Sequence, residues 1–126
     1  MKLTEKEFRE LVEMALKGLP GSIRDRMENI DVAVENRAPQ HLLTQLGLQS
    51  AYELLGLYQG VPFGRRGFYY GNVLPDKITL FKNPIESMCK TKKELEEKVK
   101  EVIIHEVGHY FGMSDEKLRK LERGEG

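Results

Sequence analysis

Residues 105–116 read His105-Glu-Val-Gly-His-Tyr-Phe-Gly-Met-Ser-Asp-Glu116, and this stretch decides how the rest of the chain is interpreted. Residues four apart lie on one face of a helix, so His105 and His109 can direct ring nitrogens at a common point. Glu106 follows at a rotation of about 100° and stays beside that point. Two imidazoles with an adjacent carboxylate are typical of a catalytic zinc ion and its general base. The stretch therefore predicts a helical zinc site.

A third ligand has to come from beyond this helix. Gly112 can adopt the left-handed conformation that ends a helix, and the chain then turns back toward the histidines. The acidic residues that follow are Asp115 and Glu116, and the spacing favours Asp115. Ser114 and Asp115 are also residue types that cap helices, so capping of a terminal helix is the competing interpretation. The two roles are compatible, because a carboxylate has two oxygens.

The neighbours of the histidines argue against two ordinary surface histidines. Between Val102 and Phe111 the one charged residue is Glu106, and the others are Val, Ile, Gly, Tyr, Phe and His. A helix that is apolar on most sides is expected to be buried. An ionised glutamate in such a helix needs a partner or a metal ion, which favours the metal site.

Composition limits the function classes. The 126 residues carry 20 basic and 20 acidic side chains, so no broad electric field attracts nucleic acid or a membrane. We expect one domain over residues 1–126. The single cysteine, Cys89, excludes an internal disulfide. The polar N-terminus does not read as a signal peptide, so we expect a cytoplasmic protein without membrane partners.

Local patterns predict helices and strands along the chain. A capping box at Thr4 begins a helix that ends near Gly18, and a second box at Thr91 begins the long helix of the site. Alternating branched residues predict a strand over residues 30–35, and residues 77–81 form another strand. Shorter helices are expected over residues 22–29, 50–55 and 114–122.

The stretch from Tyr58 to Asp76 is the least regular part of the chain. It is rich in glycine and proline and carries Arg66, Tyr69 and Tyr70. Long loops in compact domains are often functional, so these three side chains are candidates to stabilise an oxyanion. A β-hairpin whose aromatic residues pack on the core is the alternative.

His105 to Glu116, together with the runs from Leu54 to Pro62 and from Leu74 to Leu80, resembles the small bacterial minimal zincin family of metallopeptidases. The resemblance implies an α+β fold. It would be a reduced zincin-like domain, with a small mixed β-sheet packed on a long metal-site helix with flanking helices. It also implies that a strand over residues 78–81 lines the cleft.

The same resemblance implies that Zn²⁺ is held by His105, His109 and Asp115, that Glu106 is the general base, and that the substrate is a peptide or protein. The chain departs from the larger metzincins, which have a third histidine where Asp115 stands. Met113 lies inside the motif and is not their methionine turn.

Two other functions fit parts of the pattern. A metal-dependent endoribonuclease of the ribosomal-RNA maturation type also has two histidines four apart, but Glu106 and the neutral net charge count against it. A zinc-binding module without catalysis is the second alternative. A purely structural site closes its fourth position with another ligand, so Glu106 favours catalysis.

Overall fold

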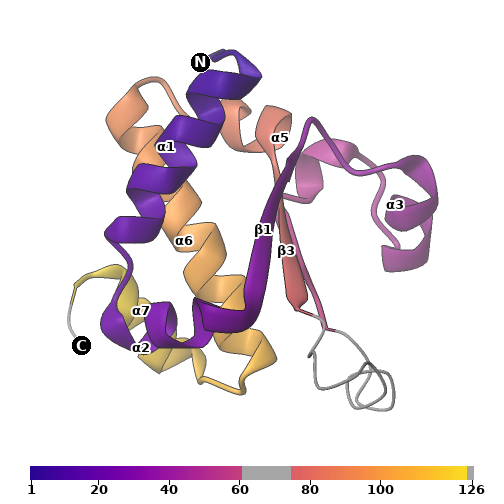
Figure 1. The fold of residues 1–126 in the computed structure, drawn as a ribbon. Coiled ribbons are helices and arrows are strands. Elements are labelled where there is room, and N and C mark those ends of the chain that lie inside the picture. Colours follow the sequence, from indigo (N-terminus) through magenta and orange to yellow (C-terminus); the bar gives the residue numbers. More distant parts are fainter. Residues whose placement is uncertain (61–74, 125–126) are drawn as a thin grey trace, which may run out of the picture.

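The computed structural model describes residues 1–60 and 75–124 and has an α+β fold (Figure 1). In chain order the elements are α1 (Glu5–Lys17), α2 (Gly21–Arg24), the 3-10 helix η1 (Asp25–Asn29), β1 (Ile30–Glu35), α3 (Gln40–Leu46), the 3-10 helix η2 (Ala51–Glu53), β2 (Gly56–Gln59), β3 (Asp76–Phe81), α5 (Lys82–Ser87), α6 (Lys92–Tyr110) and α7 (Asp115–Glu122). None of the described helices is long and apolar enough to cross a membrane.

The sheet is small and mixed, as the family resemblance implied, with strand order β1-β3-β2. β1 runs parallel to β3, with Ile30 opposite Asp76, and β2 runs antiparallel to β3, with Gly56 opposite Leu80. The strands expected at residues 30–35 and 77–81 are confirmed as β1 and β3, whereas β2 was not predicted. The strand over residues 78–81, expected to line the cleft, is the central strand β3, and β2 is the strand at the edge beside α6.

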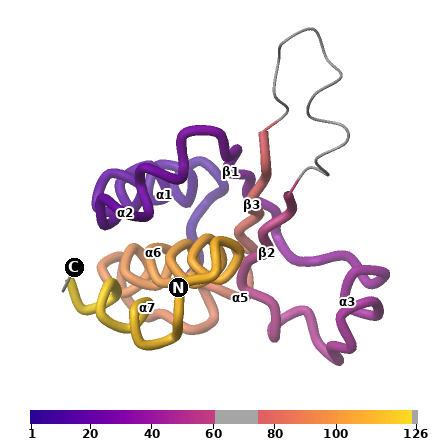
Figure 2. The backbone as a smooth tube through the Cα atoms, turned by 90° about the horizontal axis from the view of Figure 1, so that it is seen from below, coloured from indigo at the N-terminus to yellow at the C-terminus, as the bar shows by residue number. Residues whose placement is uncertain are grey.

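Helices cover the two faces of the sheet unequally. α1, α2, α6 and α7 gather on one side of the strands, and α3 lies on the other side (Figures 1 and 2). Side chains alternate along β3, so Ile78 and Leu80 join the main core with α1 and α6. Phe81 points the other way into a small cluster with Leu43 of α3. The main core therefore fixes α6 against the sheet.

The helix starts follow the predicted caps in part. Thr4 and Ser50 each form the reciprocal capping box that their sequences predict, although the helical turn at Ser50 ends at Glu53 and not near residue 55. Thr91 accepts from the backbone N–H of Glu94 and begins α6. The Glu94 carboxylate accepts from the N–H of Lys90, however, so the second half of that box is not formed.

The burial predicted for the second half of α6 holds for most of its length. Val102, Ile103, Ile104, Val107 and Gly108 are buried. The last turn was expected to be buried as well and is not, because Tyr110 is 49% and Phe111 is 44% exposed. These residues extend past the core, which leaves the C-terminal end of α6 open to solvent.

Candidate metal centre and active site

α6 presents both motif histidines on one face. The ring centroids of His105 and His109 are 5.5 Å apart and their planes meet at 67°. Four residues correspond to about one helical turn, which places the two rings one above the other. Both side chains remain partly accessible, so α6 is anchored by its buried residues while its histidines reach solvent.

A tight turn after α6 reverses the chain. Gly112 has φ of +78°, as the sequence predicted, and its N–H bonds to the carbonyl of His109 at 3.1 Å. The N–H of Met113 bonds to the carbonyl of Gly108 at 2.8 Å. This pair of bonds is the Schellman motif, which needs a residue that tolerates positive φ. The turn returns α7 along α6.

Ser114, not Asp115, is the N-cap of α7. Its hydroxyl accepts from the backbone N–H of Lys117 at 3.1 Å, and Asp115 is the first helical residue. The Asp115 carboxylate is therefore not used in side-chain capping. Its oxygen Oδ1 lies 3.2 Å from Nε2 of His109. Glu116 points elsewhere, with its carboxylate 3.8 Å from Lys120 Nζ.

Close packing fixes the position of α7. A Cβ atom added to Gly108 would lie 2.1 Å from Leu118 Cδ2, so Leu118 occupies the space that the missing side chain leaves. Leu118 and Leu121 are buried. The absence of a side chain at residue 108 lets α7 approach α6 closely enough for acidic residues at both of its ends to reach the histidines.

Glu122, at the end of α7, is a residue that the sequence analysis missed. Its oxygen Oε1 contacts Nε2 of His105. The Glu122 side chain is 22% exposed, against 75% for Asp115. Oε1 itself is buried, so its contact with the imidazole of His105 is made away from solvent. The sequence did contain a signal for this residue. Glu122 follows Leu118 by four positions, which places both side chains on the same face of α7.

The two histidines lie in two neighbouring groups of side chains that could hold a metal. Asp115 meets His109, whereas Glu122 and Glu101 surround His105. Within the described residues, the donor atoms of Glu101, His105 and Glu122 all lie within 4.8 Å of one another. The donor atoms of His105, His109 and Asp115 do not meet this criterion as a set.

The side chain of Glu106 extends from α6 to the edge strand β2. Its oxygen Oε1 accepts from the backbone N–H of Tyr58 in β2 at 3.3 Å. Burial raises the pKa of Glu106 above its usual value, while the Tyr58 hydrogen bond and the two histidines act in the opposite direction. The site thus places a half-buried carboxylate of raised pKa beside two imidazoles.

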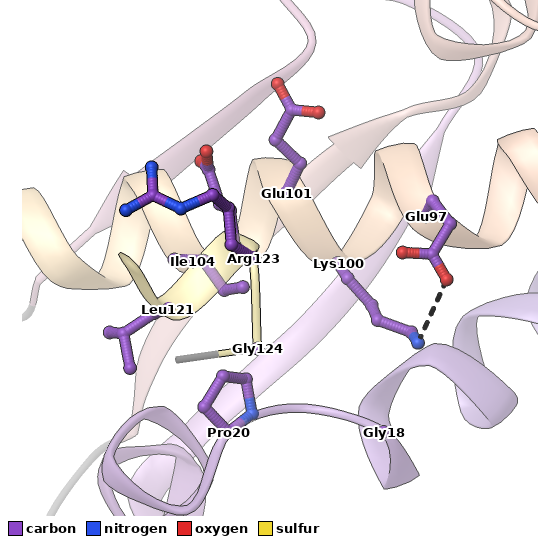
Figure 3. A pocket seen from close by; sticks show the side chains of 10 residues that line it. Gly18, Pro20, Glu97, Lys100, Glu101, Ile104, Leu121, Arg123 and Gly124 are labelled. Carbon is purple, nitrogen blue, oxygen red and sulfur yellow. Dashed lines mark hydrogen bonds and ion pairs between the residues drawn. The ribbon is translucent and has the colours of Figure 1, made fainter. Parts of the chain in front are cut away.

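A groove of about 240 Å³ runs beside these groups. Its lining comes from η2, the start of β2 and α6, and comprises Glu53, Leu54, Leu55, Gly56, Glu101, Val102, His105 and Glu106. A second hollow, of about 470 Å³, lies where Ile104 of α6, Leu121 of α7 and Pro20 meet (Figure 3). The two hollows share Glu101, but His105 and Glu106 line the smaller groove. The smaller groove is therefore the one that the motif residues of α6 line.

Arg66, Tyr69 and Tyr70, the candidates for oxyanion stabilisation, lie outside the described residues.

The structure brings His105, Glu106 and His109 together with acidic groups of α7, on a helix packed against a three-stranded mixed sheet. That arrangement agrees with a comparison with protein families, in which the model of zincin-like metallopeptidases matches residues 27–125. The chain belongs to the zincin-like metallopeptidase family.

None of the curated proteins compared with the chain matches it. Zincin-like metallopeptidases use a zinc ion, and membership suggests a zinc-dependent hydrolase that acts on peptides. The matched region includes β1, β3 and the whole of α6 and α7. The family therefore accounts for the elements that build the site.

Proposed function

We propose that this zincin-like metallopeptidase hydrolyses peptide bonds, with Glu106 as the general base. The observation that carries the proposal is the position of the Glu106 carboxylate, which is half-buried beside two histidines and hydrogen-bonded to the N–H of an edge-strand residue, Tyr58. An edge strand can pair with an extended peptide. Glu106 is thus held where such a peptide would lie.

The residues of the site fit a zinc ion. His105 and His109 offer imidazole nitrogens from one helical face, and each of those nitrogens already has a carboxylate oxygen beside it. Imidazole and carboxylate are the donors that catalytic zinc sites use. We propose that His105, His109 and Asp115 hold the ion. Among the described residues, Glu122 and Glu101 are further carboxylates within reach of His105.

When bound, zinc supplies Lewis acidity, which makes water reactive near neutral pH. Glu106 removes the proton of the attacking water and returns a proton to the leaving amine nitrogen. Its raised pKa suits this work, because a base is most effective when its pKa approaches the working pH. The Tyr58 N–H orients the carboxylate toward the strand edge and leaves its second oxygen for the water.

The alternatives are weaker. A structural zinc site would have no use for a half-buried glutamate beside the histidines, since burial raises the free energy of its charged form. An endoribonuclease needs cations for phosphate, and none of the described residues that line the groove is lysine or arginine.

The test is zinc-dependent cleavage of a mixed peptide library followed by mass spectrometry. Cleavage should stop when the metal is removed with a chelator and return when zinc is added back. A protein that binds zinc yet cleaves no peptide in the library would support the binding module instead.

We further propose that residues 1–126 form one domain, supported by a main core that joins α1, the sheet, α6 and α7.

A further inference from the structure

The groove beside β2 is acidic. Glu53 and Glu101 line it together with Glu106. The Glu53 carboxylate accepts hydrogen bonds from the backbone N–H groups of Gln49 and Ser50 at 2.8 and 2.7 Å, which fix its position at the rim of the groove. Glu101 has a cationic partner, Lys98, at 3.2 Å. Lys98 thus offsets the charge of Glu101.

A bound Zn²⁺ ion would not make the net charge around the groove positive. The charge of Zn²⁺ equals the summed charge of the ionised Asp115 and Glu106 carboxylates. The charges of the ion and of these two carboxylates then cancel. The two negative charges of Glu53 and Glu101 remain, against the one positive charge of Lys98. A bound side chain in the groove therefore meets a negative potential.

Gly56 marks where a peptide beside β2 would send its side chain. The N–H of Phe81 bonds to the carbonyl of Leu55 at 2.9 Å, so Leu55 faces β3 and the backbone groups of Gly56 face the opposite edge. The Tyr58 N–H, which meets Glu106 across that same edge, agrees with this alternation. Gly56 is buried against α6 but lines the groove, so an added strand would reach its backbone from the groove.

The direction of the side chain follows from the missing Cβ of Gly56. A Cβ built there would lie 2.6 Å from Val102 Cγ1, so it would point toward α6. Residues opposite each other on paired strands send their side chains to the same face. The peptide residue opposite Gly56 therefore points toward Val102 and Glu101. It lies two residues along the strand from the position opposite Tyr58, where Glu106 is held.

We infer that the groove selects a lysine or arginine side chain of the substrate, at a position within two residues of the bond that is cleaved. This inference rests on the proposed peptidase function and narrows its substrates to basic peptides. Glu53 and Glu101 attract the positive end of the side chain, and its aliphatic part lies along Val102 and Leu55, as long basic side chains commonly do.

The experiment compares peptides that the protein cleaves, with lysine, glutamine or glutamate at each of the two positions on either side of the cleaved bond. At one of these positions kcat/KM should be on the order of tenfold higher for lysine than for glutamate, as two partly exposed charge pairs allow. Glu53→Gln and Glu101→Gln should each reduce that ratio by about threefold. Glu53→Gln preserves the capping box, because the amide oxygen can still accept from the backbone.

Glu97→Gln is the matched control. Glu97 lies one turn before Glu101 on α6 and lines the other hollow, where it pairs with Lys100 at 3.4 Å (Figure 3). Glu97→Gln removes the same charge from the same helix and should leave the ratio of kcat/KM between lysine and glutamate peptides unchanged. Zinc content should be equal in all variants. Equal kcat/KM for lysine and glutamate peptides, or an equal loss in Glu97→Gln, would overturn the inference.

Failure of the proposed function would look different. If the zinc-loaded protein cleaves no peptide, its affinity for labelled lysine and glutamate peptides is measured by fluorescence anisotropy. Tighter binding of the lysine peptide that is lost in Glu101→Gln would support the acidic groove without catalysis. Equal affinities would overturn it.

Discussion

The carboxylate of Glu106 and the backbone N–H of Tyr58 are joined by a hydrogen bond of 3.3 Å that connects the middle of α6 to the edge strand β2. The two residues are 48 positions apart in the chain. This contact orients a candidate catalytic group by a backbone donor, which every substitution of Tyr58 other than proline retains. It makes Glu106 the first residue to test.

Glu106→Gln should abolish hydrolysis and leave zinc binding and folding intact. Glutamine keeps the size of glutamate and an oxygen that can accept from Tyr58, but it cannot take up a proton as a carboxylate does. Zinc content by atomic emission and peptide cleavage by mass spectrometry are the measurements. Loss of zinc in this variant would make Glu106 a ligand and remove it from the role of base.

The stability of the metal-free protein should depend on the ionisation of Glu106. Burial raises the pKa of Glu106 in the folded protein, so the folded state holds the proton at pH values where the unfolded chain has released it. The contribution of this residue to stability is complete below the unfolded pKa and is lost as the pH rises through the folded pKa.

Glu106→Gln, which cannot ionise, should therefore gain stability relative to the wild type as the pH rises from about 4 to 8. Urea denaturation in the presence of a chelator, at several pH values, measures this difference. A difference that shrinks with rising pH would show that the folded state favours the charged carboxylate.

His105→Ala and His109→Ala should each reduce zinc binding to near background, because either change leaves the ion with too few ligands to compete with water. Both side chains are partly accessible, so the fold should persist. His41→Ala, which alters the remaining histidine of the chain, is the control and should bind zinc like the wild type. Equal zinc in all three variants would refute the metal site.

The third ligand can be identified by three conservative changes on α7. Asp115→Asn should weaken zinc binding at least tenfold while stability stays near that of the wild type, because Ser114 provides the side-chain cap of the helix. Glu116→Gln should bind zinc normally, since Glu116 faces Lys120. Glu122→Gln should cost less affinity than Asp115→Asn. A zinc titration in which Glu122→Gln loses more affinity than Asp115→Asn would assign the third ligand to Glu122.

Gly108→Ala should destabilise the protein and weaken zinc binding. The new Cβ would lie 2.1 Å from Leu118 Cδ2, and overpacking of this kind costs about 1–3 kcal/mol. The better helix propensity of alanine returns up to about 1 kcal/mol. Gly21→Ala is the matched control, because nothing lies within 4 Å of its added Cβ. Denaturation curves that place Gly108→Ala level with the wild type would mean that α7 is not held by this contact.

Local sequence alone determined the framework of the site. The spacing of His105 and His109, the cap at Thr91 and the left-handed turn at Gly112 depend on residues within one or two helical turns, and the structure shows α6 and its turn where these signals place them. The strands β1 and β3 were predictable for the same reason, since short runs of branched and aromatic residues are local patterns.

Tertiary structure alone decided which groups meet at the site. β2 has four residues and no strong alternation, so its pairing with β3 and its contact with Glu106 could not be inferred from its own sequence. Likewise, the approach of Glu122 to His105 depends on how closely Leu118 packs on Gly108. Such contacts join segments distant in the chain, and packing selects them among many pairings that local propensity leaves equally possible.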